Sequence, residues 1–257
     1  MQLLNKKNIV IIGGSTGMGL SAAKAIVAQG ANVVVVGRNG SNVREVEHTL
    51  GKPCKGYTGD ACDADTAVNA IELCIDAFGG FDGLYHVAGG SGRKMGDGPL
   101  HEITLEGWNR TMELNLVSLM LSNQAAVKKF LLLNQPGSIL NIGSVLGFSP
   151  APQYFATHAY AAAKAAAIGF IKSIASYYAK NNIRVNLIAP ALVETPMSQR
   201  AIGNEEIVAF IKAKQPLDGG RVGEAEDLDG LVVYFLSDQS KFTTGQVIAV
   251  DGGWSIS

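Results

Sequence analysis

The stretch IVIIGGSTGMGLSAAKAIV, residues 9–27, decides the fold expected of this chain. Four β-branched residues run directly into a glycine-rich turn, and an alanine-rich helical pattern follows. Gly13, Gly17 and Gly19 follow the spacing G-x-x-x-G-x-G rather than the commoner G-x-G-x-x-G. Glycines allow a tight turn, and a helix N-terminus offers unpaired N–H groups to phosphate. The turn is either a dinucleotide site or an ordinary strand–turn–helix corner.

The rest of the chain repeats the same alternation of strand and helix. Short apolar runs predict strands at residues 9–12, 32–36, 83–88, 138–143, 184–189 and 246–250, with a weaker one ending at residue 59. Helical patterns lie at residues 18–29, 65–78, 105–133, 159–179, 205–214 and 225–236. This order predicts a single α/β domain over residues 1–257 with a doubly wound, parallel seven-stranded sheet, the Rossmann fold. It also favours dinucleotide binding at the first turn. The polar, Gly-punctuated segment 194–224 is predicted to be a mobile substrate lid.

Composition excludes several classes of protein. Hydrophobic residues make up 47% and charged residues 17% of the 257 residues, enough for a sizeable core. A net charge of -1 argues against nucleic acid as a partner, and no apolar stretch reaches membrane-spanning length. The three cysteines, Cys54, Cys62 and Cys74, lack metal-type spacing, so no metal site is expected. Their odd number, with no apolar run typical of a signal peptide, predicts a cytoplasmic protein.

The end of the second strand indicates which dinucleotide binds. Sites for NAD usually place an Asp or Glu there to accept the ribose 2′-OH, but none occurs between Leu20 and Arg44. The strand ends instead in Gly-Arg-Asn, and Arg38 either meets a 2′-phosphate or is a solvated loop residue. The missing carboxylate favours NADP, with NAD as the alternative.

Candidate chemistry lies in the stretch HAYAAAKAAAIGF, residues 158–170. Helical spacing puts Tyr160 and Lys164 one turn apart, where an ammonium group would lower the phenol pKa from about 10. The pair is either a proton-transfer unit or an unremarkable surface pair. Ser144 follows a predicted strand at the edge where such sheets bind ligands. Asn115, in an otherwise apolar helical pattern, is either a satisfied core amide or one that holds water.

In this order, the glycine motif, Asn115, Ser144 and Tyr160-x-x-x-Lys164 resemble the short-chain dehydrogenase/reductase family, in particular its 3-oxoacyl-[acyl-carrier-protein] reductase-like members. The resemblance spans nearly the whole chain, through RVNLIAPALVETPM to the closing TGQVIAVDGGW. It implies that Tyr160 is the general acid in carbonyl reduction, or the base in alcohol oxidation. It also implies that Lys164 lowers the Tyr160 pKa and binds the nicotinamide ribose, that Ser144 polarises the substrate oxygen, and that Asn115 holds a relay water.

The resemblance further implies a set of cofactor contacts and a homotetramer. The cofactor-binding residues expected from the motifs together are Gly13, Ser15, Thr16, Gly17, Met18, Gly19, Arg38, Asn39, Asp60, Ala61, Ala88, Gly89, Tyr160, Lys164, Pro190, Val193 and Thr195. Asp60 is alternatively a turn residue. The helical patterns at residues 113–133 and 159–179 carry more Ala and Leu than one buried stripe needs, and the matching helices of the family form its subunit interfaces.

The sequence also departs from the family. His86 and Val87 stand where two asparagines usually precede Ala-Gly; His86 either replaces an amide or is a packed structural histidine. The interval from Ser144 to Tyr160 is longer than usual, and its Phe148, Tyr154 and Phe155 either shape an apolar pocket or pack against the lid or another subunit.

Two functions are compatible with these patterns. The first is an oxidoreductase that moves hydride between NADP(H) and a ketone/secondary alcohol pair. Its substrate would be a small molecule such as a 3-oxoacyl thioester, a polyol or sugar, or a larger cyclic ketone, and the apolar loop favours an acyl or ring substrate. The second is a non-catalytic NADP(H)-binding redox sensor or scaffold protein.

Overall fold

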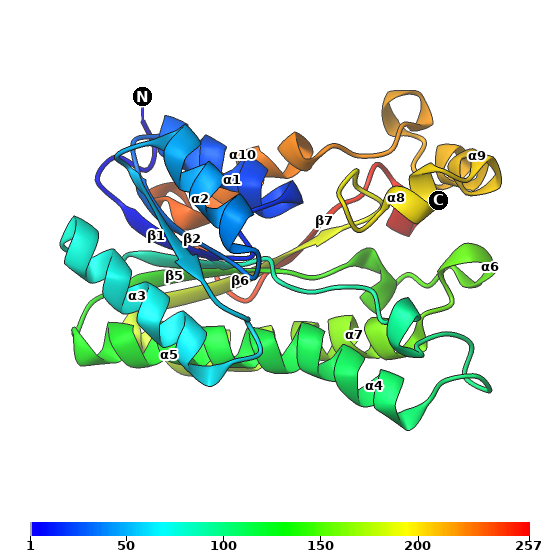
Figure 1. Cartoon of the computed structure of the whole chain (residues 1–257), viewed down its shortest axis with the longest axis horizontal. Helices are drawn as coiled ribbons and strands as arrows, with labels where there is room; N and C mark the ends of the chain where they lie inside the picture. Colours follow the sequence, from blue (N-terminus) through cyan, green and yellow to red (C-terminus); the bar gives the residue numbers. More distant parts are fainter. Residues whose placement is uncertain (1) are drawn as a thin grey trace.

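The computed structural model describes residues 2–257 and contains a seven-stranded, all-parallel sheet (Figure 1). The strand order is β3-β2-β1-β4-β5-β6-β7, so the chain winds outward from β1 and then crosses back to start the other half at β4. The strands are β1 (Asn8–Ile12), β2 (Asn32–Gly37), β3 (Cys54–Thr58), β4 (Gly83–His86), β5 (Gly137–Ile142), β6 (Ile183–Pro190) and β7 (Val247–Val250). The predicted doubly wound sheet is confirmed.

Helices cover both faces of the sheet (Figure 1). One face carries α3 (Ala64–Phe78), α4 (Leu105–Met112), α5 (Ser118–Leu132) and α7 (His158–Tyr178), and the other carries α1 (Gly17–Ala28), α2 (Gly40–Leu50) and α10 (Asp229–Leu236). Three further helices, α6 (Pro152–Phe155), α8 (Gln199–Ile202) and α9 (Glu205–Lys214), gather with the C-terminus beyond one end of the sheet.

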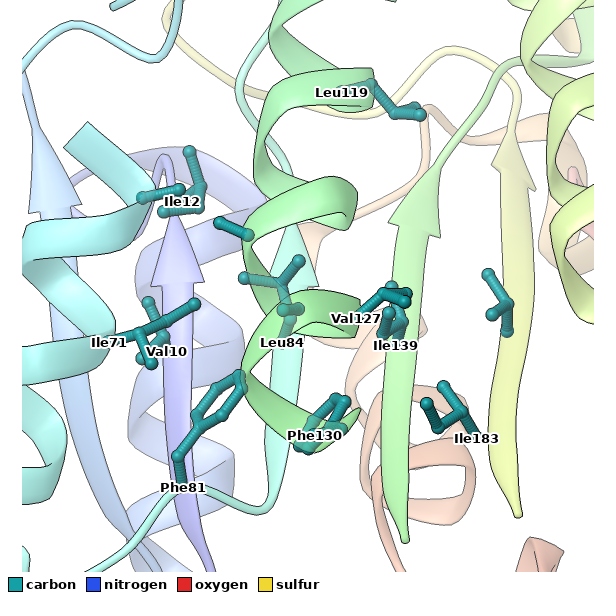
Figure 2. Close-up of a cluster of buried hydrophobic side chains, with 14 of the residues drawn as sticks. Val10, Ile12, Ile71, Phe81, Leu84, Leu119, Val127, Phe130, Ile139 and Ile183 are labelled. Carbon is teal, nitrogen blue, oxygen red and sulfur yellow. The ribbon is translucent and has the colours of Figure 1, made fainter. Parts of the chain in front are cut away.

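Alternate residues of each strand supply two separate cores. Val10 and Ile12 of β1 pack toward α3 and α5, whereas Ile9 and Ile11 pack toward α1 and α10. Figure 2 shows the first core, with helix side chains lying over those of the strands. Every residue of β1 is buried, which explains why the central strands read as continuous apolar runs.

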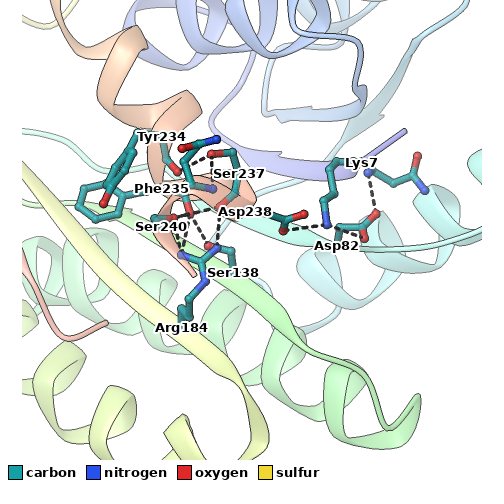
Figure 3. Close-up of polar contacts among 11 residues, drawn as sticks. Lys7, Asp82, Ser138, Arg184, Tyr234, Phe235, Ser237, Asp238 and Ser240 are labelled. Atoms are coloured by element: carbon teal, nitrogen blue, oxygen red, sulfur yellow. Dashed lines mark hydrogen bonds and ion pairs between the residues drawn. The ribbon is translucent and has the colours of Figure 1, made fainter. Parts of the chain in front are cut away.

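At the amino ends of the strands, a polar cluster fastens α10 to the sheet (Figure 3). Arg184 of β6 donates to the carbonyls of Phe235 (3.0 Å) and Ser237 (3.2 Å) and to the hydroxyl of Ser240 (2.6 Å). The Ser138 hydroxyl of β5 donates to the same Phe235 carbonyl at 2.8 Å. These contacts tie α10 and the turn after it to the amino ends of β5 and β6.

Two expected helices differ from the structure. The pattern over residues 105–133 is divided, because a π-helical segment, Glu113–Val117, separates α4 from α5. Helix α2 was not predicted, since only Val43 and Val46 of its eleven residues are buried. Its start is marked by Asn39, whose Oδ1 accepts the N–H groups of Ser41 and Asn42.

Within residues 2–257, no helix has the length and apolar character needed to cross a membrane. The same part of the chain contains no group of three or more His, Cys, Asp or Glu side chains that could hold a metal ion.

Candidate functional site

Two contiguous cavities open at the carboxyl ends of the strands. The first, which we term the glycine-turn cavity, lies over the ends of β1, β2 and β4, and so includes the point where the strand order reverses. The second, the Tyr160 cavity, lies beyond β5 and β6 and is lined by both Ser144 and Tyr160. Met18, Thr195 and Met197 line both cavities, so a ligand in one can reach the other.

The glycine turn needs its glycines for two different reasons. Gly13 has a φ of +92°, and a Cβ there would lie 2.7 Å from the backbone N of Ala88. A Cβ on Gly19 would lie 2.0 Å from the Gly13 carbonyl oxygen, so α1 could not pack onto the turn. Helix α1 begins at Gly17 with no side-chain cap from Thr16 and no acidic residue in its first turn. Its N-terminal N–H groups therefore remain available to an anion.

Most of the predicted cofactor residues meet in one place. Those lining the glycine-turn cavity are Gly13, Ser15, Thr16, Gly17, Met18, Arg38, Asn39, Asp60, Ala61, Ala88, Gly89 and Thr195. Pro190 and Val193 line the Tyr160 cavity instead, while Gly19, Asn115 and Lys164 lie behind the cavity walls. The sequence analysis missed Gly37, Asn42, Gly59, Val87 and Leu114, which also line the glycine-turn cavity.

The polar residues at the far end of this cavity differ in whether they already have hydrogen-bond partners. Arg38 is exposed and, among the described residues, forms no hydrogen bond or ion pair. Asp60 accepts the backbone N–H of Cys62 at 3.0 Å, which is the bonding of a turn residue. A glycine cradle and an uncapped helix N-terminus together fit the phosphates of a dinucleotide, and the guanidinium of Arg38 stays free at the far end of the cavity.

Helix α7 places Tyr160 and Lys164 on one face, with the Lys164 Nζ 5.5 Å from the centroid of the Tyr160 ring. Lys164 is buried and its Nζ donates to the Ile142 carbonyl at the end of β5 (3.0 Å). Burial lowers the pKa of Lys164 to about 8.

The expected lowering of the Tyr160 pKa by Lys164 stays a prediction, because two other influences dominate in this structure. Burial raises the Tyr160 pKa, and the opposing influence is a hydrogen bond with the Ser144 side chain. The phenol is therefore neutral at pH 7, with the serine hydroxyl beside it.

Asn115 lies in the π-helical segment and is fully buried. Its Oδ1 accepts the Gly90 N–H (3.0 Å), and its Nδ2 donates to the carbonyls of Gly90 (2.9 Å) and Thr111 (2.9 Å). The side-chain amide is therefore satisfied within the core, and the expected relay water stays a prediction. A Cβ on Gly89 would lie 2.8 Å from Asn115 Oδ1 and 3.6 Å from Lys164 Nζ, so the two groups meet at that glycine.

Asp97 holds Tyr160 in place and was missed by the sequence analysis. Its buried carboxylate accepts the N–H groups of Ala159 and Tyr160, each at 2.9 Å. It thereby caps α7, whose adjacent Thr157 makes no side-chain cap. No local sequence signal reveals this cap, because 62 residues separate the aspartate from Ala159.

Comparison with known proteins agrees with this geometry. The model of the family described as enoyl-(acyl carrier protein) reductase matches residues 13–255. The chain is 30% identical to the 2,5-dichloro-2,5-cyclohexadiene-1,4-diol dehydrogenase of Sphingobium indicum, over 99% of both chains. It is 32% identical to the 3-oxoacyl-[acyl-carrier-protein] reductase of Chlamydia trachomatis, over 98% of both. A short-chain dehydrogenase/reductase structure from Mycobacterium ulcerans superposes with a TM-score of 0.88 at 28% identity, covering 98% of this chain and 91% of the other.

The chain belongs to the short-chain dehydrogenase/reductase family. It is thus an oxidoreductase that resembles enzymes acting on alcohols and ketones, and members of this family bind NAD(P). In this short-chain dehydrogenase/reductase, the glycine-turn cavity is where the residues fit that nucleotide.

His86, an unusual residue for this family, proves to be a packed structural histidine. It is 1% exposed, its Nδ1 lies 2.8 Å from the Ser122 hydroxyl, and burial lowers its pKa to about 3. The amide contact between helix and sheet is made elsewhere, by Asn123 of α5 and Asn141 of β5, which exchange hydrogen bonds of 2.7 and 3.1 Å.

The enlarged loop of this short-chain dehydrogenase/reductase serves both of the roles considered for it. Phe155 lines the Tyr160 cavity and packs edge-on against Trp254, with centroids 5.6 Å apart. Tyr154 packs against Phe210 of α9, within the segment expected to form the lid (5.4 Å). Phe148 is 45% exposed and lines neither cavity, so it does not shape the pocket, and its packing against another subunit stays a prediction.

Proposed function

We propose that the protein transfers hydride between NADP(H) and a ketone/secondary alcohol pair, with Tyr160 as general acid in reduction and general base in oxidation. The observation that carries this proposal is the shared cavity. Ser144 and Tyr160 line the same cavity, which shares lining residues with the glycine-turn cavity. The bound nucleotide would supply or accept the hydride.

The protein groups have separate tasks in this reaction. Ser144 Oγ accepts the Leu146 N–H at 3.2 Å, and its hydroxyl, which meets Tyr160 in this structure, would turn its proton to a substrate carbonyl oxygen. Tyr160 is a neutral phenol at pH 7, with a pKa that burial raises further, and it donates its proton to that oxygen. The ammonium of Lys164 then stabilises the phenolate that proton transfer leaves behind.

The first experiment is absorbance-monitored oxidation of NADPH and NADH, in parallel, with acyl thioesters, sugars, cyclic ketones and quinones. We expect Tyr160→Phe to abolish turnover and to leave NADPH affinity within about twofold, because only the acidic hydroxyl is removed. Tyr177→Phe is the matched control, since Tyr177 is exposed on the same helix. An undiminished rate in Tyr160→Phe would rule out the acid role. Binding of NADPH without turnover by the unaltered protein would favour the sensor or scaffold function.

The preference for NADP rests on Arg38. We expect Arg38→Ala to weaken NADPH binding by about 10- to 100-fold and to change NADH binding little, because a charge-assisted contact with the 2′-phosphate is lost. Lys52→Ala removes one exposed positive charge outside the cavity and serves as the control. Equal losses for both nucleotides would contradict this role.

Three further properties remain proposals. Segment 194–224 would close over the ligands as a lid, since Thr195, Met197 and Arg200 contribute to the cavity walls. The homotetramer is proposed on the analogy with the family. A cytoplasmic location is proposed on the odd cysteine count alone.

A further inference from the structure

The wall of the Tyr160 cavity has an unusual charge pattern. The cavity has an empty volume of about 880 Å³ including its open mouth, and most of its wall is apolar, with Leu146, Phe155 and Trp254 as the larger contributors. Two arginines, Arg93 and Arg200, also line it. Within residues 2–257, no acidic side chain lines this cavity. A ligand bound beside Tyr160 thus meets positive charge without any negative charge.

The two arginines converge from distant parts of the chain. Arg93 follows β4 and Arg200 lies in α8, yet both donate an Nη2 hydrogen bond to the carbonyl oxygen of Tyr154, at 2.8 and 3.5 Å. Both guanidinium groups therefore lie within a few ångströms of one another. Burial, together with the nearby charge of Arg200, lowers the pKa of Arg93.

No carboxylate neutralises this pair. Across the described residues, neither Arg93 nor Arg200 has an acidic oxygen within 4.0 Å. Asp97 attracts Arg93 from beyond ion-pair distance, while each of its oxygens accepts one of the N–H groups that it caps on α7. Arg93 is half-buried and Arg200 is exposed, so the nearby positive charge is felt mainly by Arg93.

A purely structural role explains only part of this arrangement. The carbonyl of Tyr154 is satisfied by the 2.8 Å bond from Arg93, so the longer bond from Arg200 adds little. Each guanidinium has five N–H donors, and most of them remain free to bind a ligand. Paired guanidinium groups with free donors are well suited to a carboxylate, sulfonate or phosphate.

We propose that Arg93 and Arg200 form a subsite for an anionic group of the substrate, so that the substrate is a ketone or secondary alcohol joined through an apolar spacer to a carboxylate, sulfonate or phosphate. The subsite rests on the proposed function, because Tyr160 defines where the reacting oxygen lies. It adds one negatively charged end to the acyl or ring substrate that the apolar loop favours.

Matched substrates test the subsite directly. The probes are 4-oxocyclohexanecarboxylate and its methyl ester, with 3-oxobutane-1-sulfonate and 3-oxobutyl phosphate to distinguish the kind of anion. We expect the unaltered protein to have a higher kcat/KM for one or more of the anions than for the ester. We expect Arg200→Gln to lower the anion-to-ester ratio by about 10-fold or more, chiefly through KM. Arg200→Lys, which keeps the charge but loses the planar fork, should restore part of the ratio.

The control is Lys94→Gln, which removes one positive charge from the exposed residue next to Arg93 and lies outside the cavity wall. It should leave the anion-to-ester ratio within about twofold, since the distant charge is screened by solvent. No preference for any anion in the unaltered protein, or an unchanged ratio in Arg200→Gln, would overturn the subsite.

A binding measurement separates the subsite from the reaction. Cyclohexanecarboxylate and cyclohexanecarboxamide, which contain no ketone, are titrated calorimetrically into the NADPH-saturated protein. Carboxylate binding that Arg200→Gln weakens, without turnover of any ketone, would uphold the subsite and refute the proposed reaction. Turnover of ketones without preference for anions would refute the subsite and leave the reaction standing. If the protein neither binds the carboxylate nor prefers anionic ketones, the subsite is refuted.

Discussion

The buried ammonium of Lys164 should destabilise the fold at neutral pH. Its pKa falls from 10.5 to about 8 because burial disfavours the charged form, and no carboxylate compensates. Above pH 10.5 the lysine is neutral in both the folded and the unfolded state, so no penalty applies. As the pH falls toward 8, the unfolded chain binds the proton first and stability is lost. The shift of about 2.5 pKa units corresponds to about 3 kcal/mol at pH 7.

Replacement Lys164→Met removes this titration. Urea unfolding at pH 7 and pH 10, without nucleotide, gives the free energy of unfolding of both proteins. The unaltered protein should gain about 2 to 3 kcal/mol relative to Lys164→Met between these pH values. The lost hydrogen bond to the Ile142 carbonyl lowers the stability of the variant at both pH values, so this loss cancels in the comparison. Lys172→Met, at an exposed position of the same helix, should show no comparable pH dependence.

The same variant links stability to activity. Loss of the ammonium should lower turnover by about 100-fold or more, since the hydrogen bond from neutral Ser144 would be left to stabilise the Tyr160 phenolate without a positive charge. A difference in stability between the two proteins that does not change with pH would refute the reasoning. It would mean that the lysine is hydrated, or paired with an anion, in the folded protein.

Two further predictions concern the neighbourhood of the glycine turn. Burial lowers the pKa of His86 from 6.5 to about 3, so between pH 7 and pH 4 only the unfolded chain binds the proton. The free energy of unfolding of the unaltered protein should therefore fall by about 3 kcal/mol more than that of His86→Asn over this range, as measured by urea unfolding. His48→Asn, at an exposed position, should show no such trend. Gly13→Ala should abolish NADPH binding and destabilise the fold by several kcal/mol, because its Cβ would lie 2.7 Å from Ala88 N. Gly51→Ala, with φ +71° and open space around it, should cost only about 1 kcal/mol. If thermal unfolding shows equal losses of stability for Gly13→Ala and Gly51→Ala, the backbone relieves the clash with Ala88 and the reasoning fails.

Much of the architecture could be predicted because its signals are local. A strand buried on both faces is predominantly apolar, and β1 and β2 show this directly in the sequence after their first residue. The spacing of Tyr160 and Lys164 was equally readable, because four residues on a helix fix a relative position whatever surrounds them. Their pKa values were not readable, since burial depends on the packing of the whole sheet edge.

Elements that depend on polar contacts were harder to predict. Helix α2 buries little and owes its start to the Asn39 cap, so hydrophobic periodicity gave a weak signal. The π-helical segment occurs where Asn115 bonds to the Gly90 backbone and to Thr111. A regular helix of the same sequence has the same apolar pattern, so only the contact with the loop after β4 distinguishes the two.

The groups that would select a substrate were the least predictable, and the reason is topological. A parallel sheet brings the loops after all its strands to one edge, so side chains distant in sequence meet there. Arg93 and Arg200 come from the loops after β4 and β6, and each alone is typical of a solvated surface arginine. Their significance arises only from convergence on one carbonyl beside Tyr160. Reaction type in this fold is therefore carried by spacing within one helix, whereas substrate preference is carried by loops that only the folded sheet brings together.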